Sequence, residues 1–325
     1  MKFFRIVLVL FHCAVLALLF MNFLNAWIPP SKISFLNALS LAFPALMLIN
    51  VALCLLWILL RKKRAIFFIL LSLLFLNPVK RWVNYTSKSE LQPNLKIVTG
   101  NFQNGKLGYE KINSYLEKTD SDIIFAQEAG WQVSVPGFEY RLTEYPLVTL
   151  HSKFKILHHE KISTFANGSS FYADLDIRGK TVRLVNAYLD PFELDKRRVK
   201  PTDNLDQNER KLRYVLGRFF PTFKTHQKEI TAIRKVIDTS PYPVILAGDF
   251  NAVPNSYEYY QLGKNLNDAF MKVGRGSATS FHDYKVPLRI DYIFTSDEIK
   301  AVNYQVDRNA NVSDHFPVIA EFKLD

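Results

Sequence analysis

Val244-Ile245-Leu246-Ala247-Gly248-Asp249-Phe250-Asn251 is the stretch that decides the fold of this chain. Its four apolar residues predict a buried strand, and the glycine, carboxylate and amide that follow predict a turn carrying polar groups. An apolar strand that delivers a carboxylate or an amide at its end is the usual geometry of a site built on a rigid sheet. Other strands that end in this way would mark the same site.

The same pattern recurs along the chain, where polar residues stand at or beside the ends of predicted strands. Taken singly, an Asp after a strand is more often a turn or a helix cap than a ligand, and an isolated His is more often structural. Seven polar groups in five segments instead indicate one site. Its candidate members are Asn101, Glu128, Asp249, Asn251, Asp291, Asp314 and His315.

From residue 95 onward, short apolar runs alternate with turns and a few helical patterns. Helices are expected over Tyr109–Lys118 and His226–Asp238, where apolar residues recur at helical spacing. About 230 residues of this mixture fit one α/β domain whose sheets are covered by helices. Strands are expected at Leu95–Thr99, Ile123–Ala126, Phe171–Ile177, Val182–Ala187, Val244–Ala247, Ile290–Thr295 and Val318–Phe322.

Residues 1–83 are predicted to form a membrane anchor. Ile6 to Ile28 and Ile33 to Leu60 contain no Asp, Glu, Lys or Arg, and each exceeds the roughly 20 residues that a spanning helix needs. The asparagines within these runs are expected to face a neighbouring helix. A cleaved leader is the alternative for the first run, although that run is long and lacks a clear small-x-small site. Residues 84–94 are predicted to be a polar linker.

A third apolar run, residues 65–79, decides on which side of the membrane the rest of the chain lies. Arg61 to Arg64 precede it, and basic loops stay in the cytoplasm, as should the amino terminus. If the third run also crosses, the domain after it lies outside the cytoplasm, on the periplasmic or extracellular face. We favour crossing because the run is apolar on all sides. Its short length leaves an interfacial helix as the alternative.

The formal charge of +11 over 325 residues invites a nucleic-acid interpretation. Residues 1–90, however, hold ten Lys or Arg and one Glu, so +9 belongs to the anchor and +2 to the remainder. The charge therefore mostly flanks membrane segments and sets their orientation. Both cysteines, Cys13 and Cys54, lie in the apolar runs, which excludes a disulfide framework or a cysteine metal site in residues 91–325.

The seven polar groups suit a phosphoester-hydrolysing site that contains a hard cation. Mg²⁺ prefers carboxylate oxygens together with water and substrate phosphate, which suits Glu128 with Asn101 beside it, and Mn²⁺ is the alternative ion. Asp249 stands where it can accept a proton from attacking water, and Asn251 where it can hold phosphoryl oxygens. His315, held as an imidazolium by a neighbouring carboxylate, would stabilise developing negative charge.

These motifs resemble the endonuclease/exonuclease/phosphatase superfamily, which includes deoxyribonuclease I, exonuclease III, neutral sphingomyelinases and inositol-polyphosphate 5-phosphatases. The resemblance runs from about Leu95 to Leu324 and implies a four-layer α/β sandwich of two β-sheets flanked by helices. It rests on Gly248-Asp249-Phe250-Asn251, on Arg-Ile-Asp-Tyr-Ile at 289–293 and on Ser-Asp-His-Phe-Pro at 313–317, in that order, with Ile-Ile-Phe-Ala-Gln-Glu at 123–128 upstream.

The resemblance also implies roles for the site residues. Glu128 and Asn101 would bind the metal, with Asp314 beside it. Asp249 would activate or orient the water, and Asn251 would support the phosphate. Asp291 would orient His315. We also assign substrate-binding roles to Asn186 and Arg289.

The chain departs from the family pattern at two positions. Many members have Asn-x-His where this chain has Asn186-Ala187-Tyr188. A Tyr at this place resembles the exonuclease III branch, where its hydroxyl serves the phosphate, and a packing role for Tyr188 is the alternative. Gln103 stands where some nuclease relatives have an acidic residue, which leaves open whether the site takes one metal or two.

An insertion between Pro191 and Lys224 carries nine basic residues against five acidic ones, together with several aromatics. It is either a solvated loop and helix or an arm that meets anionic phosphate, on lipid headgroups or on a nucleic-acid backbone. No base-reading motif is identifiable in the sequence.

The leading hypothesis is a membrane-anchored, Mg²⁺-dependent phosphoester hydrolase in which water attacks phosphorus in line. Its expected partners are a phosphate-ester substrate and membrane lipids, and the favoured substrate is a lipid headgroup or another phosphate ester of the envelope. An extracytoplasmic nuclease of the same fold is one alternative, with nucleic acid the less favoured substrate. A non-catalytic membrane interaction protein that retains the fold is another. The sequence does not indicate an oligomeric state.

Overall fold

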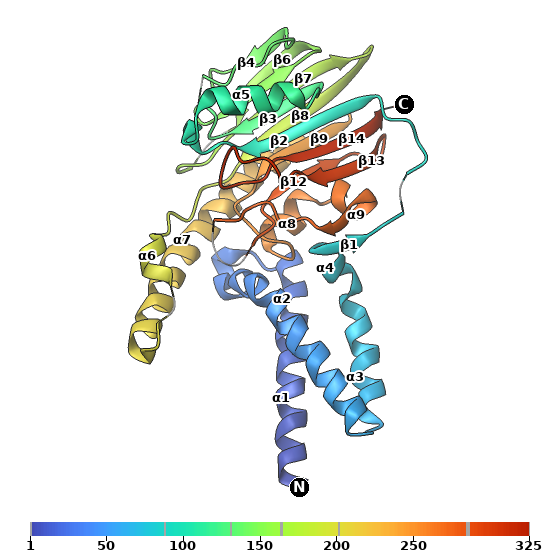
Figure 1. Cartoon of the computed structure of the whole chain (residues 1–325), viewed down its shortest axis with the longest axis vertical. Helices are drawn as coiled ribbons and strands as arrows, with labels where there is room; N and C mark the ends of the chain where they lie inside the picture. The colour runs from blue at the N-terminus through green and yellow to red at the C-terminus, as the bar shows by residue number, and fades with distance from the viewer. Residues whose placement is uncertain are drawn as a thin grey trace.

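The computed structural model describes residues 2–87, 89–130, 132–162, 165–200, 202–283 and 287–324. A bundle of apolar helices formed by the amino-terminal segment stands below a domain of sheets and helices (Figure 1). Lys88 and Lys285 lie outside the described residues, and so do the side chains of Lys2, Lys196 and Arg197.

The first sheet of the domain has the strand order β13-β14-β2-β3-β5-β4. Strands β2 and β3 run parallel, and the other neighbouring pairs run antiparallel. Its strands are β2 (Leu95–Asn101), β3 (Ile123–Gln127), β4 (Tyr140–Leu142), β5 (Val148–Ser152), β13 (Ile299–Val306) and β14 (Val318–Leu324).

The second sheet has the strand order β10-β12-β9-β8-β7-β6, in which only β8 and β9 are parallel among the described strands. Its strands are β6 (Lys155–Ile162), β7 (Ser169–Ile177), β8 (Lys180–Tyr188), β9 (Val244–Asp249), β10 (Asn267–Asp268) and β12 (Asp291–Thr295).

The two sheets pack face to face, and helices cover their outer faces. Phe125 of the first sheet and Phe171 of the second belong to one fully buried cluster between them. Helix α5 (Tyr109–Lys118) covers the first sheet, with Leu116 in a separate buried cluster, and α7 (Leu205–Asp238) covers the second, with Ile233 buried against it. The predicted four-layer α/β sandwich is confirmed. Shorter helices complete the domain: η3 (Gln103–Gly105), α6 (Lys196–Val199), α8 (Tyr257–Leu262) and α9 (Ala269–Val273).

All seven predicted strands are present, each within two residues of its expected bounds. The strands that the sequence did not indicate are mainly short or at sheet edges. β6, for example, reads Lys-Ile-Leu-His-His-Glu-Lys-Ile and is mostly exposed. Edge strands face solvent on several sides, so they carry charged residues and lack the apolar pattern of a buried strand. The predicted linker likewise begins inside strand β1 (Val83–Tyr85), which pairs with β11 (Arg275–Ser277).

Helix α7 is far longer than the segment predicted from His226 onward. It begins at Leu205, where the Asn204 side chain accepts a hydrogen bond of 3.0 Å from the backbone nitrogen of Gln207. Such an N-cap stabilises the first turn of a helix. Pro221 lies inside the helix and disfavours it locally, which is why the sequence pattern indicated a later start.

The amino-terminal helices pack together through a buried polar contact. They are α1 (Lys2–Met21), η1 (Asn22–Ala26), α2 (Pro30–Leu59), α3 (Arg64–Ser72), η2 (Leu73–Phe75) and α4 (Leu76–Lys80). The Nε2 atom of His12 lies 3.0 Å from Asn50 Oδ1, and its ring stacks on Phe68 at 3.8 Å. Asn50 in turn donates to Ser72 at 2.8 Å. The third apolar run therefore packs alongside the first two helices.

Two asparagines of the amino-terminal helices contact the domain instead of facing only a neighbouring helix. Asn37 Nδ2 donates to both carboxylate oxygens of Glu258 at 2.8 Å, and Asn25 Nδ2 donates to the carbonyl of Asn255 at 2.9 Å. Glu258 is fully buried and also lies 2.9 Å from His226 Nδ1. These buried hydrogen bonds hold the first turns of α2 against the domain.

Candidate active site

The predicted site residues meet at one edge of the sandwich because of the strand directions. Parallel strands bring their carboxyl ends to the same edge, as β2 and β3 do in one sheet and β8 and β9 in the other. Strands β12 and β14 run antiparallel to β9 and β2, so their amino-terminal ends come to that edge too. The polar side chains that gather there are Asn101, Glu128, Tyr188, Asp249, Asp291 and His315.

Glu128 links the two sheets. Its Oε1 atom accepts hydrogen bonds of 2.8 Å from Asn101 Nδ2 and of 2.8 Å from the Tyr188 hydroxyl, which comes from the opposite sheet. Its Oε2 atom lies 3.4 Å from Asn104 Nδ2, a contact that the sequence analysis missed. The Asn104-Gly105 pair after β2, typical of a turn, was the available signal.

The end of β9, where Asp249 lies, depends on Gly248. This glycine has φ of 142°, and a Cβ atom there would lie 2.0 Å from the carbonyl oxygen of Ala187. Only glycine allows β9 to approach β8 so closely at this point. At this strand end Asp249 Oδ2 lies 3.1 Å from Asn101 Nδ2, while its Oδ1 accepts a bond of 2.8 Å from the Asn251 backbone nitrogen.

Asn251 follows in the left-handed region, with φ of 45°, which Asn tolerates better than most residues. Its Nδ2 atom donates to the carbonyl of Leu189 at 2.9 Å. The side chain is therefore held in place at the end of the strand pair formed by β8 and β9.

His315 and Asp291 form a buried pair beside Asp249. The Nδ1 atom of His315 lies 2.9 Å from Asp291 Oδ2, and its Nε2 atom lies 3.9 Å from Asp249 Oδ2. Asp291 is fully buried and His315 is 5% exposed. A carboxylate on Nδ1 fixes the orientation of the ring and leaves Nε2 directed toward Asp249.

Burial and charge shift the protonation equilibria of these groups. Burial raises the pKa of Asp249 to about 7, and the neighbouring Asp291 carboxylate adds to the rise. Burial alone would lower the pKa of His315, but the carboxylates of Asp291 and Asp249 outweigh it and raise that pKa to about 10. His315 is therefore cationic near neutral pH, whereas Asp249 can gain or lose a proton there.

The hydroxyl of Tyr188 keeps its proton. Burial raises its pKa well above the usual range, and the Glu128 carboxylate raises it further. The side chain is 3% exposed and donates its proton to Glu128. It therefore acts in this site as a neutral hydrogen-bond donor.

Gln103 joins Asp314 to the rest of the site. Its Nε2 atom donates to Asp314 Oδ2 at 2.8 Å, and its backbone nitrogen donates to Asn101 Oδ1 at 3.0 Å. Gln103 stands where some nuclease relatives have an acidic residue. It thus bridges Asp314 and Asn101, two residues that were predicted to bind the metal. Through it, one continuous hydrogen-bonded network runs from Asp314 to Asp249.

The two residues predicted to bind substrate have structural partners instead. Asn186 is fully buried, and its Oδ1 accepts a bond of 2.7 Å from Gln127 while its Nδ2 donates to the Thr149 carbonyl at 2.9 Å. The Arg289 guanidinium is fully buried and makes a two-point ion pair with Asp268 at 2.7 and 2.9 Å. These contacts favour packing roles, in which Asn186 ties the sheets together and Arg289 supports the segment before Asp291.

The donor atoms of the site suit a divalent cation. Glu128, Asn101 and Asp314 offer carboxylate and amide oxygens, which hard cations prefer, and they share one hydrogen-bonded network. Asp249, Asp291 and His315 each offer one ligand atom, and these three atoms lie within 4.8 Å of one another. The first group offers oxygen donors alone, whereas the second includes a histidine nitrogen, so the first group fits a hard ion better.

Comparison with known proteins agrees with this geometry. The sequence model of the endonuclease/exonuclease/phosphatase family matches residues 98–315, which contain every predicted site residue. The chain belongs to this family. Family members hydrolyse phosphoester bonds and generally depend on divalent metal ions. A second family model, described as a domain of unknown function, matches residues 4–82, where the apolar helices lie.

Solved structures of this endonuclease/exonuclease/phosphatase fold are similar to the chain at low identity. A humanised TDP2 from D. rerio is 15% identical, with a TM-score of 0.52, and the match covers 70% of this chain and 98% of that one. A mannosyl-6-phosphatase from Bacteroides thetaiotaomicron is 17% identical, with a TM-score of 0.51 and coverage of 71% and 100%. A 3′ phosphatase from Neisseria bound to a product DNA hairpin has the same values. No curated protein matches the chain.

Proposed function

We propose that this chain is a membrane-anchored phosphoester hydrolase in which water attacks phosphorus in line. The observation that carries the proposal is the network at the sandwich edge, in which a sheet-bridging carboxylate, a buried Asp and a buried His–Asp pair are held together. The favoured substrate is a phosphate ester of the membrane or of the envelope compartment.

Each residue of the network has a role in this reaction. Asp249 accepts the proton of the attacking water, because its carboxylate is poised near neutral pH. His315, positively charged and oriented by Asp291, stabilises the negative charge that develops on the phosphoryl oxygens. The Asn251 amide holds those oxygens, and Tyr188 donates a hydrogen bond at the same edge.

Glu128, Asn101 and Asp314 would hold the divalent cation, Mg²⁺ or Mn²⁺. The cation would neutralise charge on the phosphate and lower the pKa of bound water. Tyr188 and Asn101 keep Glu128 in position by donating to the same carboxylate oxygen. This contact supports a role for Tyr188 in the site over a role in packing alone.

Removal of metal is expected to abolish hydrolysis. A chelator should stop turnover of a phosphate ester by the detergent-solubilised chain, and added Mg²⁺ should restore it. Glu128→Gln removes one anionic ligand, so it should raise the Mg²⁺ concentration for half-maximal rate by at least about 10-fold, the smallest usual effect of losing even a residue that supports a ligand. Glu110→Gln, on the exposed surface of α5, is the matched control. Full activity in chelator would remove the metal from the proposal.

The arrangement of the apolar helices supports a membrane anchor with the domain outside the cytoplasm. Two helices in the described residues, Phe3–Ala26 and Pro30–Leu59, are long and apolar enough to cross a membrane, and 28% of an 18-residue stretch in each is buried. A core helix of a soluble protein would be mostly buried, whereas Leu48 and Leu59 of α2 are 73% and 78% exposed.

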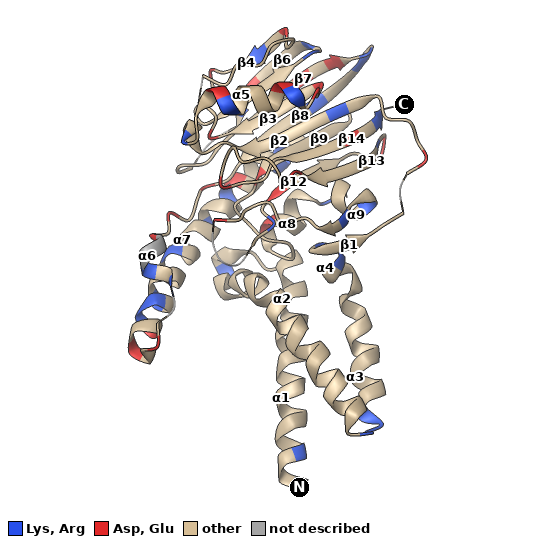
Figure 2. Ribbon diagram, in the orientation of Figure 1, with Lys and Arg blue, Asp and Glu red and all other residues tan. Residues whose placement is uncertain are grey.

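The positions of the basic residues also support a domain outside the cytoplasm. The basic loop between α2 and α3 and the amino terminus lie at the same end of the bundle, and α3 and α4 return to the domain at the other end (Figure 2). The stretch from Arg64 to Lys80 is about 25 Å long as a helix, close to the roughly 30 Å of a hydrocarbon core. Three crossings with a cytoplasmic amino terminus would satisfy the positive-inside rule.

Reporter fusions test this orientation. A reporter that is active only in the cytoplasm should be silent when fused after Glu90 and active when fused after Arg61, because one crossing segment separates the two sites. Activity at both positions would contradict the three-span arrangement and place the domain in the cytoplasm.

A nuclease is the alternative function, and one observation favours it. The 3′ phosphatase that is similar in fold is bound to a DNA product. A panel of phospholipids, sphingomyelin, inositol phosphates and DNA, presented to the solubilised chain, separates the two functions by the substrate that is turned over fastest. Turnover of any of them above the background of an Asp249→Ala variant would exclude a non-catalytic role.

A further inference from the structure

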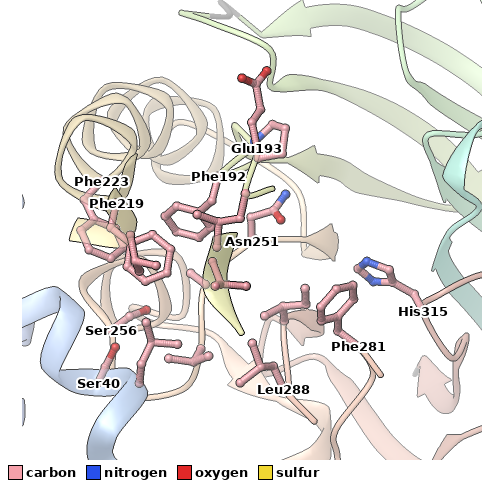
Figure 3. Close-up of a pocket in the computed structure, with 18 residues that line it drawn as sticks. Ser40, Phe192, Glu193, Phe219, Phe223, Asn251, Ser256, Phe281, Leu288 and His315 are labelled. Atoms are coloured by element: carbon pink, nitrogen blue, oxygen red, sulfur yellow. The ribbon is translucent and has the colours of Figure 1, made fainter. Parts of the chain in front are cut away.

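An apolar pocket of about 460 Å³ lies beside the catalytic edge. Asn251 and His315 line one part of it, and Leu41 and Ser40 of helix α2 line another. Figure 3 shows His315 on one side of the pocket and Phe192, Phe219 and Phe223 on the other. Ser40 of α2 lies on the side of these phenylalanines. The volume falls in the ~300–1,000 Å³ range of sites for small molecules.

Three phenylalanines form a continuous wall at the end away from His315. Phe192 and Phe219 have ring centroids 4.4 Å apart, and Phe223 lies 5.4 and 5.6 Å from them. Two of these rings come from α7 and the third from the segment before it, so the wall is built by the insertion between Pro191 and Lys224. An aromatic wall of this kind favours hydrocarbon over polar ligands.

The pocket lies where α2 leaves the domain. Asn37 is bound to Glu258, whereas the part of α2 from Leu41 to Leu59 has its most exposed apolar side chains. From Leu41 to Leu60 the chain has 20 residues, which is about 30 Å of helix and matches a hydrocarbon core. The level of Leu41 is thus the expected membrane surface, and the pocket meets it there.

We propose that this pocket binds the apolar chain of a membrane amphiphile whose phosphate is held at Asn251 and His315. This inference rests on the proposed function, because it names the substrate class of the same site. The lipid would enter from the leaflet that faces the domain, with its phosphate at the sandwich edge and its chain along the wall of Phe192, Phe219 and Phe223.

The lining argues against a nucleic-acid strand in this pocket. None of the described residues that line it is Lys or Arg, and the acidic Glu193 is among them. A polynucleotide carries a phosphate on every residue and needs basic contacts along its path. A ligand with one phosphate ester and a long hydrocarbon chain avoids that repulsion.

The test uses alkyl 4-nitrophenyl phosphate diesters with ethyl, hexyl and decyl chains, so that the leaving group is constant. For the full chain in nanodiscs, we expect kcat/KM to rise with chain length, by up to about fourfold per methylene until the pocket is filled. Val215→Trp, which fills the pocket from α7, should remove this rise and leave hydrolysis of the ethyl ester within twofold. Leu212→Trp, exposed on the same helix and not among the lining residues, is the matched control.

Two further measurements separate the outcomes. Phe219→Ala should also weaken the chain-length dependence, which guards against misfolding of the tryptophan variant. Binding of hexyl and decyl phosphate to the Asp249→Ala variant should favour the longer chain, and Val215→Trp should abolish the preference. Equal kcat/KM for all esters, unaffected by Val215→Trp, would overturn the pocket assignment and leave the hydrolase intact. Chain-dependent binding without turnover of any ester would overturn the hydrolase and leave the pocket.

Discussion

Asp249→Asn is expected to lower kcat for phosphoester hydrolysis by about 10²–10⁴-fold, the usual contribution of a general base. The substitution keeps the volume of the side chain, and its amide oxygen can still accept the hydrogen bond from the Asn251 backbone nitrogen. It removes the basic oxygen that lies beside Asn101 and His315. Steady-state rates with a chromogenic phosphodiester at saturating Mg²⁺ measure the effect.

Asp120→Asn is the matched control for this prediction. The Asp120 side chain is 90% exposed and pairs with Lys153 at the surface. The rate of the Asp120→Asn variant should therefore stay within twofold of the wild-type rate. An unchanged thermal midpoint in the Asp249 variant would show that the fold is preserved. A wild-type rate in that folded variant would remove Asp249 from the mechanism.

His315→Gln and Asp291→Asn form the second prediction. Loss of the imidazolium should lower kcat by about 10²–10³-fold with little change in KM, because its charge acts on the transition state. Asp291 is fully buried and lies 2.9 Å from His315 Nδ1, so we expect it to act through His315 as a positioning residue. The double variant should therefore be no slower than His315→Gln alone.

This non-additivity distinguishes positioning from an independent effect. If the two free-energy losses add, Asp291 acts on the reaction by a route other than His315. His158→Gln, a substitution on the exposed strand β6, controls for the loss of a histidine elsewhere in the domain. Its rate should match that of the wild type.

The members of the candidate site could be picked out in the sequence because each stands at or beside the end of an apolar strand. Asp249 and Glu128 each stand one residue beyond a run of buried apolar residues, and Asp291 begins such a run. The strand pattern places these groups at strand ends, and the antiparallel pairing of β12 with β9 brings Asp291 opposite Asp249.

Other parts of the site had no comparable signal. Asn186 and Arg289 stand beside strong motifs, yet burial turns their polar atoms inward to Gln127 and Asp268. Asn104 contributes to the site through a turn whose direction no local pattern specifies. The role of a polar residue next to a motif depends on which face of its strand or turn meets the other sheet.

The amino-acid sequence by itself determined the two apolar helices, the α/β layering and the order of the family motifs, because each depends on local hydrophobic pattern. Only the tertiary structure decided that Asn37 docks on Glu258 and that the insertion begins a helix whose phenylalanines face α2. Those contacts join residues about 150 to 220 positions apart, whose meeting is set by the packing of whole elements and not by any local pattern. The pocket beside His315 exists only through that packing.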